Sequence, residues 1–176
     1  KISCLIGIEG GHAIENSLGA LRSFYDLGVR YMTLTHWETI DWADAATDSA
    51  KHDGLTAFGE QVVLEMNRLG MLVDLSHVSD ATMMDALRVS RAPVFYSHSS
   101  ARALANHVRN VPASILRLVG QKGGVVMVNF NPGFVSEAVR LYGDSVQAWA
   151  RALRAAGGGA DSATRADSLK AWTARA

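Results

Sequence analysis

Four ionisable side chains stand where four successive short apolar runs end. In chain order they are Glu9, His36, His77 and His98. One carboxylate and three imidazoles are suitable ligands for zinc or a similar divalent cation, and the two oxygens of a carboxylate can bridge two ions. Taken together, these residue types indicate the chemistry of a metal-dependent hydrolase.

Each of these residues has a simpler explanation when it is taken alone. A single histidine near a strand end is usually a hydrogen-bonded structural side chain, and Glu9 could instead stabilise the N-terminus of a following helix. Coincidence is harder to sustain for four successive strands. The remaining histidines lack this placement, and we treat them as solvated or structural residues: His12, His52 and His107.

Two further charged residues, Asp74 and Arg109, lie within or after the third and fourth apolar runs. Arg109 follows the fourth run in a loop, where its guanidinium could be an ordinary surface cation or could bind a carboxylate-bearing substrate. Asp74 lies inside the third run, one residue before Leu75. We expect this carboxylate to support the site or the fold and not to act directly.

The elements that must position these residues follow a βα pattern. Residues 3–130 alternate short apolar runs with segments of helical period, which is typical of βα units around a parallel sheet. Strands are predicted over residues 4–8, 31–35, 71–75, 94–97 and 125–130. Each run is apolar on both faces, as expected for strands that are covered on both sides. Because the carboxyl ends of parallel strands meet at one edge, the four ionisable side chains should lie close together.

Helices are predicted between the strands, and several residues mark their ends. Gly28 and Gly70 follow two helical stretches directly and suit a left-handed C-cap. Ser79 suits the N-cap of the next helix, and Pro112 suits the first turn of the one after it. Residues 36–53 lack a clear period and are predicted to form a long loop after the second strand.

The composition narrows the class of protein. The chain has 176 residues, 17 Lys and Arg against 17 Asp and Glu, and 48% apolar residues. A net charge of zero without a basic stripe argues against nucleic acid and anionic membrane surfaces as partners. No apolar run approaches the roughly 20 residues that span a bilayer. Cys4 is the single cysteine, so a metal site must be built from His, Asp, Glu and water.

Five strings in register resemble the membrane (renal) dipeptidase family of zinc peptidases, peptidase family M19. They are Gly-Ile-Glu-Gly-Gly-His at 7–12, Leu-Thr-His at 34–36, Val-Asp-Leu-Ser-His-Val-Ser at 73–79, Ser-His-Ser-Ser-Ala at 97–101 and Arg-Asn-Val-Pro at 109–112. The resemblance implies an α/β fold, namely a partial (β/α)₈ TIM barrel of about five central βα units. Residues 1–136 would form the central part of this barrel. Residues 137–176 would form a helical, Gly-interrupted, insertion-like segment leading toward missing C-terminal strands.

The same resemblance implies a site and a reaction. Glu9 would bridge two zinc ions, and His77 and His98 would complete the ligands of one of them. His36 would contact the substrate and polarise the scissile carbonyl, and Arg109 would bind the substrate carboxylate. The implied reaction is hydrolysis of dipeptides, including those with a C-terminal D-residue, by water activated between two Zn²⁺ ions.

Two parts of the family pattern have no match in this sequence. The family's His-x-Asp zinc ligands have no counterpart before Glu9, and its late Gly-x-Asp-Phe-Asp-Gly string is absent. We therefore expect a fragment in which one of the two zinc sites is nearly complete and which is itself inactive or incomplete. The sequence leaves a homodimer and the cellular location open.

Two other interpretations remain. The chain could belong to a non-catalytic barrel relative that is used for binding or assembly. It could also belong to another amidohydrolase-type barrel that acts on cyclic amides. Arg109 and the Glu-Gly-Gly-His string argue against the second of these.

Overall fold

The computed structural model describes residues 3–155. The chain forms two compact units, and the boundary between them lies between Arg140 and Leu141. The first unit contains the sheet and all of the candidate site residues, and the second contains most of the last described helix.

Strands and helices alternate along the first unit. The strands are β1 (Ile6–Glu9), β2 (Val29–Thr33), β3 (Leu72–Asp74), β4 (Phe95–Ser99) and β5 (Val125–Val128). The helices are the 3₁₀ helix η1 (Gly11–Ile14), α1 (Leu18–Asp26), α2 (Ala57–Leu69), α3 (Asp80–Val89), α4 (Ala113–Gln121), α5 (Pro132–Val135) and α6 (Glu137–Ala155). All five predicted strands are present, and their ends differ from the predicted ends by at most two residues.

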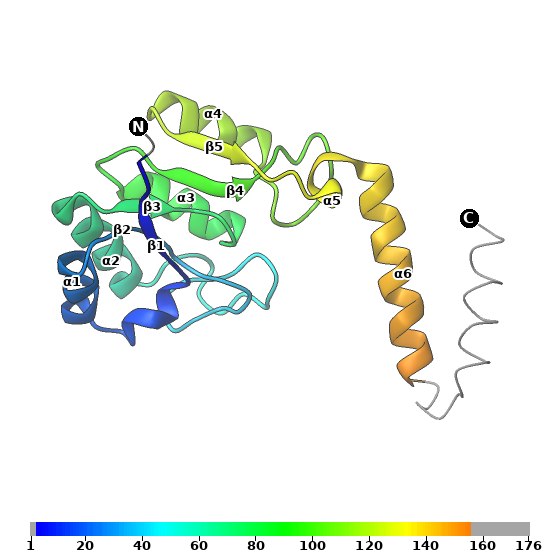
Figure 1. Cartoon of the computed structure of the whole chain (residues 1–176), viewed down its shortest axis with the longest axis horizontal. Helices are drawn as coiled ribbons and strands as arrows, with labels where there is room; N and C mark the ends of the chain where they lie inside the picture. Colours follow the sequence, from blue (N-terminus) through cyan, green and yellow to red (C-terminus); the bar gives the residue numbers. More distant parts are fainter. Residues whose placement is uncertain (1–2, 156–176) are drawn as a thin grey trace. The chain divides into compact units, whose positions relative to one another are not determined.

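The five strands form one parallel sheet in the order β1-β2-β3-β4-β5 (Figure 1). Ile8 pairs with Met32 and Met32 with Val73, so the register runs continuously across the first three strands. A doubly wound sheet reverses its strand order at a switch point, whereas a (β/α)₈ barrel adds each strand beside the previous one. This sheet has no reversal and is not closed within the described residues. The predicted α/β fold, a partial barrel of five βα units, is confirmed.

The helices that connect the strands form one layer against the sheet. Consecutive helices contact each other, α1 with α2, α2 with α3 and α3 with α4. The core lies between this layer and the strands, and its fully buried members include Leu21, Met66, Val73, Leu87 and Ile115. Burial of such side chains is the main term that holds the strand ends in place.

The prediction that every strand is covered on both faces is wrong for the two outer strands and also for the central strand β3, where Leu72 is 40% exposed. Ile6 on β1 is 59% exposed and Val125 on β5 is 55% exposed, whereas Met32 on β2 is buried. The physical reason is position in an open sheet. Within the described residues the sheet is not closed, so part of its apolar surface is uncovered, on β3 as well as on the outer strands.

Local sequence signals explain most helix ends. The Ser79 hydroxyl accepts from the backbone N–H of Thr82 and caps α3, as predicted. Gly70 ends α2 in the left-handed conformation with φ 78°, which glycine adopts without steric cost. For α1 the C-cap is Leu27, and the predicted cap Gly28 follows it with φ 104°. Pro112 occupies the N-cap of α4 and not its first turn.

The segment after β2 contains no helix or strand over residues 36–53, as predicted, but the backbone of Asp44 ties it to the start of α3 through Ser79 and Thr82. The buried carboxylate of Asp44 accepts the backbone N–H groups of Lys51, His52 and Gly54. Burial alone would raise the pKa of Asp44, but these hydrogen bonds outweigh it and lower the pKa. An ordered segment of this kind can hold His36 and Trp37, which lie at its start, in a defined position.

α6 accounts for the described part of the predicted C-terminal segment. The three glycines at 157–159 and the rest of the predicted segment up to residue 176 lie outside the described residues. The interpretation of this segment as an insertion stays a prediction. Between residues 3 and 155 no helix is both long enough and apolar enough to cross a membrane.

Candidate metal centre

Glu9, His77 and His98 come together at the carboxyl ends of β1, β3 and β4. One ligand atom from each residue lies within 4.8 Å of the other two. His77 Nε2 is 3.1 Å from Glu9 Oε1 and 2.9 Å from His98 Nε2, and His98 Nε2 is 3.3 Å from Glu9 Oε1. Ligand atoms around one tetrahedral zinc ion at about 2.0–2.1 Å stand about 3.3 Å apart. This trio could therefore hold a metal ion.

His77 is held by its backbone and by packing. It has φ 72°, a left-handed conformation that is uncommon for a residue with a Cβ and tends to occur at functional sites. Its side chain is 2% exposed, and its ring lies 4.5 Å from that of His36 and 5.1 Å from that of Trp37. Burial, and then the charge of Arg109, lower the pKa of His77 to about 3 despite a favourable contact with the backbone of His36. The imidazole is therefore neutral near neutral pH, the form in which it ligates a metal.

His98 is held by hydrogen bonds. Its backbone N–H donates to Ser76 Oγ at 3.0 Å, and its Nδ1 lies 2.7 Å from Ser97 Oγ. Ser97 Oγ in turn donates to Asp74 Oδ2 at 2.5 Å. Burial, followed by the charge of Arg109, lowers the pKa of His98. Like His77, this ring is suited to act as a neutral ligand.

Asp74 connects three strands beneath the cluster. It is fully buried at the end of β3. Its carboxylate accepts from the Thr33 hydroxyl on β2, from the Ser97 backbone on β4, and from the backbone N–H of Ser76. The sequence predicted that this carboxylate supports the site or the fold. Its contacts with Thr33, Ser76 and Ser97 agree with that prediction.

His36 lies beside the trio. It follows β2 by three residues, and its Nε2 is 3.8 Å from Glu9 Oε1. A hollow of about 250 Å³ opens next to it and is lined by His12, His36, Trp37, Glu38 and Ile40. The position gives His36 access both to the cluster and to any molecule in this hollow.

Arg109 is a buried cation close to the same cluster. It is 3% exposed, and its Nη2 donates to the backbone carbonyl of His98 at 3.5 Å. The faces of Trp37 and Phe134 lie 5.8 Å and 5.6 Å from its guanidinium carbon. Burial lowers its pKa to about 10. Within residues 3–155 its Nε has no hydrogen-bond partner and no carboxylate forms an ion pair with it, so an anionic ligand would satisfy it.

The other histidines occupy supporting positions. His12 is exposed, and a ring nitrogen of His52 contacts the backbone carbonyl of Ile40 at 2.9 Å. His107 stacks on Phe134 at 4.3 Å, and its Nδ1 accepts from the backbone N–H of Arg109 at 3.1 Å. These positions fit the solvated or structural roles expected from the sequence.

Sequence reasoning missed three residues that contact the cluster. Ser76 and Ser97 organise His98, and Trp37 packs against the rings of His36 and His77. The only signal in the sequence was adjacency, because each of the three residues is next to a candidate histidine. Periodicity carries no information about such contacts, since they depend on side-chain rotamers and on the register between strands.

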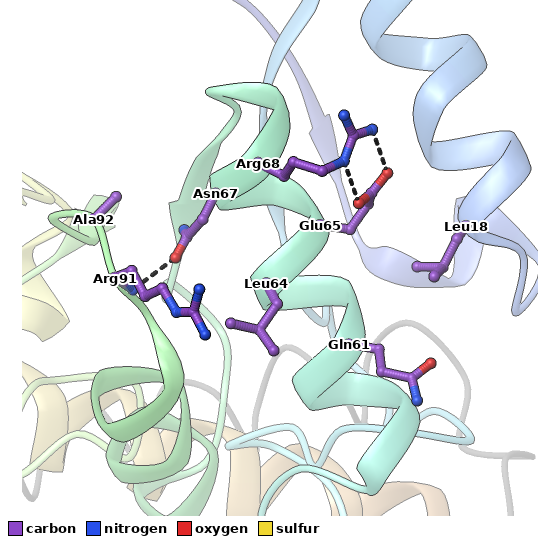
Figure 2. A pocket seen from close by; sticks show the side chains of 8 residues that line it. All are labelled: Leu18, Gln61, Leu64, Glu65, Asn67, Arg68, Arg91 and Ala92. Atoms are coloured by element: carbon purple, nitrogen blue, oxygen red, sulfur yellow. Dashed lines mark hydrogen bonds and ion pairs between the residues drawn. The ribbon is translucent and has the colours of Figure 1, made fainter.

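A hollow larger than the one beside His36 lies elsewhere and is not the metal centre. It measures about 570 Å³ and is lined by Leu18, Gln61, Leu64, Glu65, Asn67, Arg68, Arg91 and Ala92 (Figure 2). Its one carboxylate, Glu65, accepts hydrogen bonds from Arg68 at 2.7 Å and from Arg22 at 2.6 Å. These two guanidinium groups lower the pKa of Glu65 to about 2. The charge here already has partners, which is typical of a structural cluster.

The class of protein follows from the sheet and its strand ends. A run of parallel βα units with a carboxylate and histidines gathered at the carboxyl edge defines a barrel-type protein with a metal-competent site. The family model described as membrane dipeptidase (peptidase family M19) matches residues 1–171. The chain belongs to this family, as the five strings predicted, and the family implies a metal cofactor, which the donor set fits.

Individual relatives agree with this assignment. Dipeptidase 3 of Mus musculus is 52% identical over 138 residues, which are 76% of this chain and 28% of that protein. The probable dipeptidase PvdM from Pseudomonas aeruginosa superposes with a TM-score of 0.72 at 28% identity, over 75% of this chain and 35% of that one. A metallo peptidase from Rhodobacter sphaeroides is liganded with a phosphinate mimic of the dipeptide L-Ala-D-Ala. It superposes with a TM-score of 0.66 at 30% identity, over 76% of this chain and 39% of that one. The chain thus spans 28% of the length of the curated relative.

Proposed function

We propose that this chain is the central part of a zinc-dependent dipeptidase, and that the complete protein hydrolyses dipeptides, including those with a C-terminal D-residue. The observation that carries the proposal is the convergence of Glu9, His77 and His98 within 4.8 Å, close to a buried Arg109 that lacks an anionic partner within the described chain. The Rhodobacter sphaeroides relative, liganded with its mimic of L-Ala-D-Ala, supports the substrate class.

The trio supplies the ligands of one zinc ion in this proposal. Glu9 is half exposed, and its carboxylate has a second oxygen that can serve a second ion whose other ligands come from outside this chain. Zinc, when bound, lowers the pKa of water and withdraws charge from a carbonyl oxygen. The neutral imidazoles of His77 and His98 suit ligation without loss of a proton.

Two other residues bind and orient the substrate. Arg109 forms an ion pair with the carboxylate of the dipeptide, which compensates the buried guanidinium. Trp37 and Phe134 flank this cation and limit where the carboxylate can lie. His36 stands beside Glu9 and donates a hydrogen bond to the scissile carbonyl, where negative charge develops.

The test is hydrolysis of a dipeptide with a C-terminal D-alanine by the complete zinc-loaded protein. Glu9→Gln and His77→Ala should each lower kcat/KM about 10³-fold or more, because each removes a ligand of the group that activates water. Glu60→Gln on the outer surface of α2 is the matched control and should leave the rate unchanged. Equal rates in all variants would refute the assignment, and zinc binding without any dipeptide hydrolysis would favour the binding role.

A further inference from the structure

A buried hydrogen-bond chain leads from Asp74 to the candidate ligand His98. We propose that Asp74 and Ser97 fix the tautomer of His98, with the proton on Nδ1, and thereby keep the lone pair of Nε2 directed at the metal cluster. Both are positioning residues and neither is a ligand. The inference rests on the proposed metal centre, and it assigns the residues that set its affinity for zinc.

The contacts form a continuous path. Asp74 Oδ2 lies 2.5 Å from Ser97 Oγ, which lies 2.7 Å from His98 Nδ1. On the other side of the ring, His98 Nε2 is 2.9 Å from His77 Nε2 and 3.3 Å from Glu9 Oε1. One end of the imidazole therefore meets the relay and the other end meets the cluster.

The chemistry of the groups gives this path a direction. A carboxylate only accepts hydrogen bonds, whereas a serine hydroxyl has one hydrogen to donate and two sites to accept. Ser97 uses its hydrogen on Asp74 and can therefore only accept from His98. The hydrogen between Ser97 and His98 must then belong to Nδ1, which leaves Nε2 unprotonated in the neutral ring.

The neighbouring hydrogen bonds fit the same direction. Ser76 Oγ accepts from the His98 backbone at 3.0 Å and lies 3.4 Å from Ser97 Oγ, where it can donate to the second acceptor site of that hydroxyl. Asp74 is surrounded by donors, because the Thr33 hydroxyl and the backbone N–H groups of Ser76 and Ser97 also point at it. Each of these donor hydrogens has an acceptor once the relay runs from His98 to Asp74.

The other histidine of the trio has no side-chain relay of this kind in the described chain, and its favourable contact is with the backbone of His36. Within the described chain, the Nδ1 atom of His77 has no partner with hydrogen-bond geometry. A second hydroxyl on β4, that of Ser99, is likewise buried without a partner among residues 3–155. The relay is thus specific to His98, and Ser99 provides a control on the same strand with the same side chain.

The experiment measures zinc affinity of the complete metal-free protein by titration calorimetry. Ser97→Ala should weaken zinc binding about 10- to 100-fold, which is the usual effect of removing a hydrogen bond behind a ligating histidine. Ser99→Ala should leave the affinity unchanged, and Ser97→Thr should restore it by returning a hydroxyl. Unchanged affinity in Ser97→Ala, or an equal loss in Ser99→Ala, would overturn the relay.

A second measurement reports the tautomer directly. In ¹⁵N-labelled, metal-free protein, the His98 ring should carry its proton on Nδ1. Asp74→Asn presents an amide N–H₂ to Ser97, so the hydroxyl should turn toward the ring and the proton should move to Nε2. A proton on Nε2 in the unsubstituted protein would contradict the proposal, whether or not Asp74→Asn folds.

The two proposals fail separately. If the unsubstituted protein binds no zinc, the proposed function fails, whereas zinc binding that is indifferent to Ser97 refutes the relay alone. The unfolding temperature of each variant, measured without metal, shows whether a loss of affinity reflects the site and not the fold.

Discussion

Two charged clusters on this chain differ in how completely their groups are paired. On the outer helical layer, Glu65 forms ion pairs with Arg68, which Figure 2 shows, and with Arg22, and their hydrogen bonds hold its pKa at about 2. At the carboxyl edge of the sheet, burial lowers the pKa of His77 to about 3 and that of Arg109 to about 10. The surroundings of Glu65 therefore favour its charged form, whereas the surroundings of His77 and Arg109 disfavour the charged form of each.

This difference separates a structural cluster from one prepared for ligands. Buried polar atoms in folded proteins nearly always have hydrogen-bond partners. His77 Nδ1 and Arg109 Nε lack them within the described chain, whereas both oxygens of Glu65 are used. Between these two charged clusters, the pairing of the charges and not the size of the hollow marks the candidate site, because the larger hollow belongs to the paired cluster.

The largest expected effect tests how tightly the inner region is packed. A Cβ on Gly11 would lie 2.5 Å from the backbone oxygen of Leu34 and 2.4 Å from the Trp42 ring. Gly11→Ala should therefore lower the free energy of unfolding by about 3 kcal/mol, since neither neighbour can move freely. Gly120→Ala on α4 is the control, because nothing lies within 4 Å of its Cβ, and it should not destabilise. Urea unfolding of the complete protein measures both, and a tolerated Gly11→Ala would contradict this packing.

A second substitution should separate stability from binding. Arg109→Met removes a buried cation that has no partner within the described chain and should raise the free energy of unfolding by about 1–2 kcal/mol. The same change should raise KM for a dipeptide about 100-fold, because the substrate carboxylate loses its ion pair. Chemical denaturation and steady-state kinetics measure the two effects. A clear loss of stability would show that Arg109 is paired after all and would erase the contrast with Glu65.

The strain at His77 can be measured apart from its role as a ligand. His77→Ala and His77→Gly both remove the imidazole, but only glycine adopts φ 72° without a steric penalty. The glycine variant should be more stable than the alanine variant by about 1 kcal/mol. Equal stabilities in urea unfolding would mean that the backbone relaxes in both and stores no strain.

The smallest effect concerns the paired cluster. Because the folded-state pKa of Glu65 is about 2 against an ordinary value of 4.5, its contribution to stability is present above pH 4.5 and is lost as the pH falls toward 2. Arg22 and Arg68 are at least half exposed, so the contribution should be less than about 1 kcal/mol and should shrink with salt. Glu65→Gln should flatten the acid limb of a stability-pH curve by this amount. If both proteins lose the same stability between pH 4.5 and pH 2, the Glu65 carboxylate does not stabilise the fold through its arginine partners.

Most of the fold was predictable because its signals are local. Alternating apolar runs located all five strands, yet Leu34 and Thr35 leave the β2 ladder although both are buried. Strand ends depend on hydrogen bonding between strands, whereas the sequence pattern reports burial. The exposure of Ile6, Leu72 and Val125 also escaped prediction, because the sequence pattern shows that a run is apolar and not whether the sheet around it is closed.

The sequence by itself determined the family, the order of the βα units and the residue types at the strand ends. Each of these depends on residues that are close together in the sequence, either as a periodic pattern or as a contiguous string. Only the tertiary structure decided that Ser97 connects Asp74 to His98, that His77 takes a left-handed backbone and that Arg109 is buried without a carboxylate partner in the described chain. These features arise between strands that pair in space, where the register and the rotamers, and not the spacing along the chain, set which atoms meet.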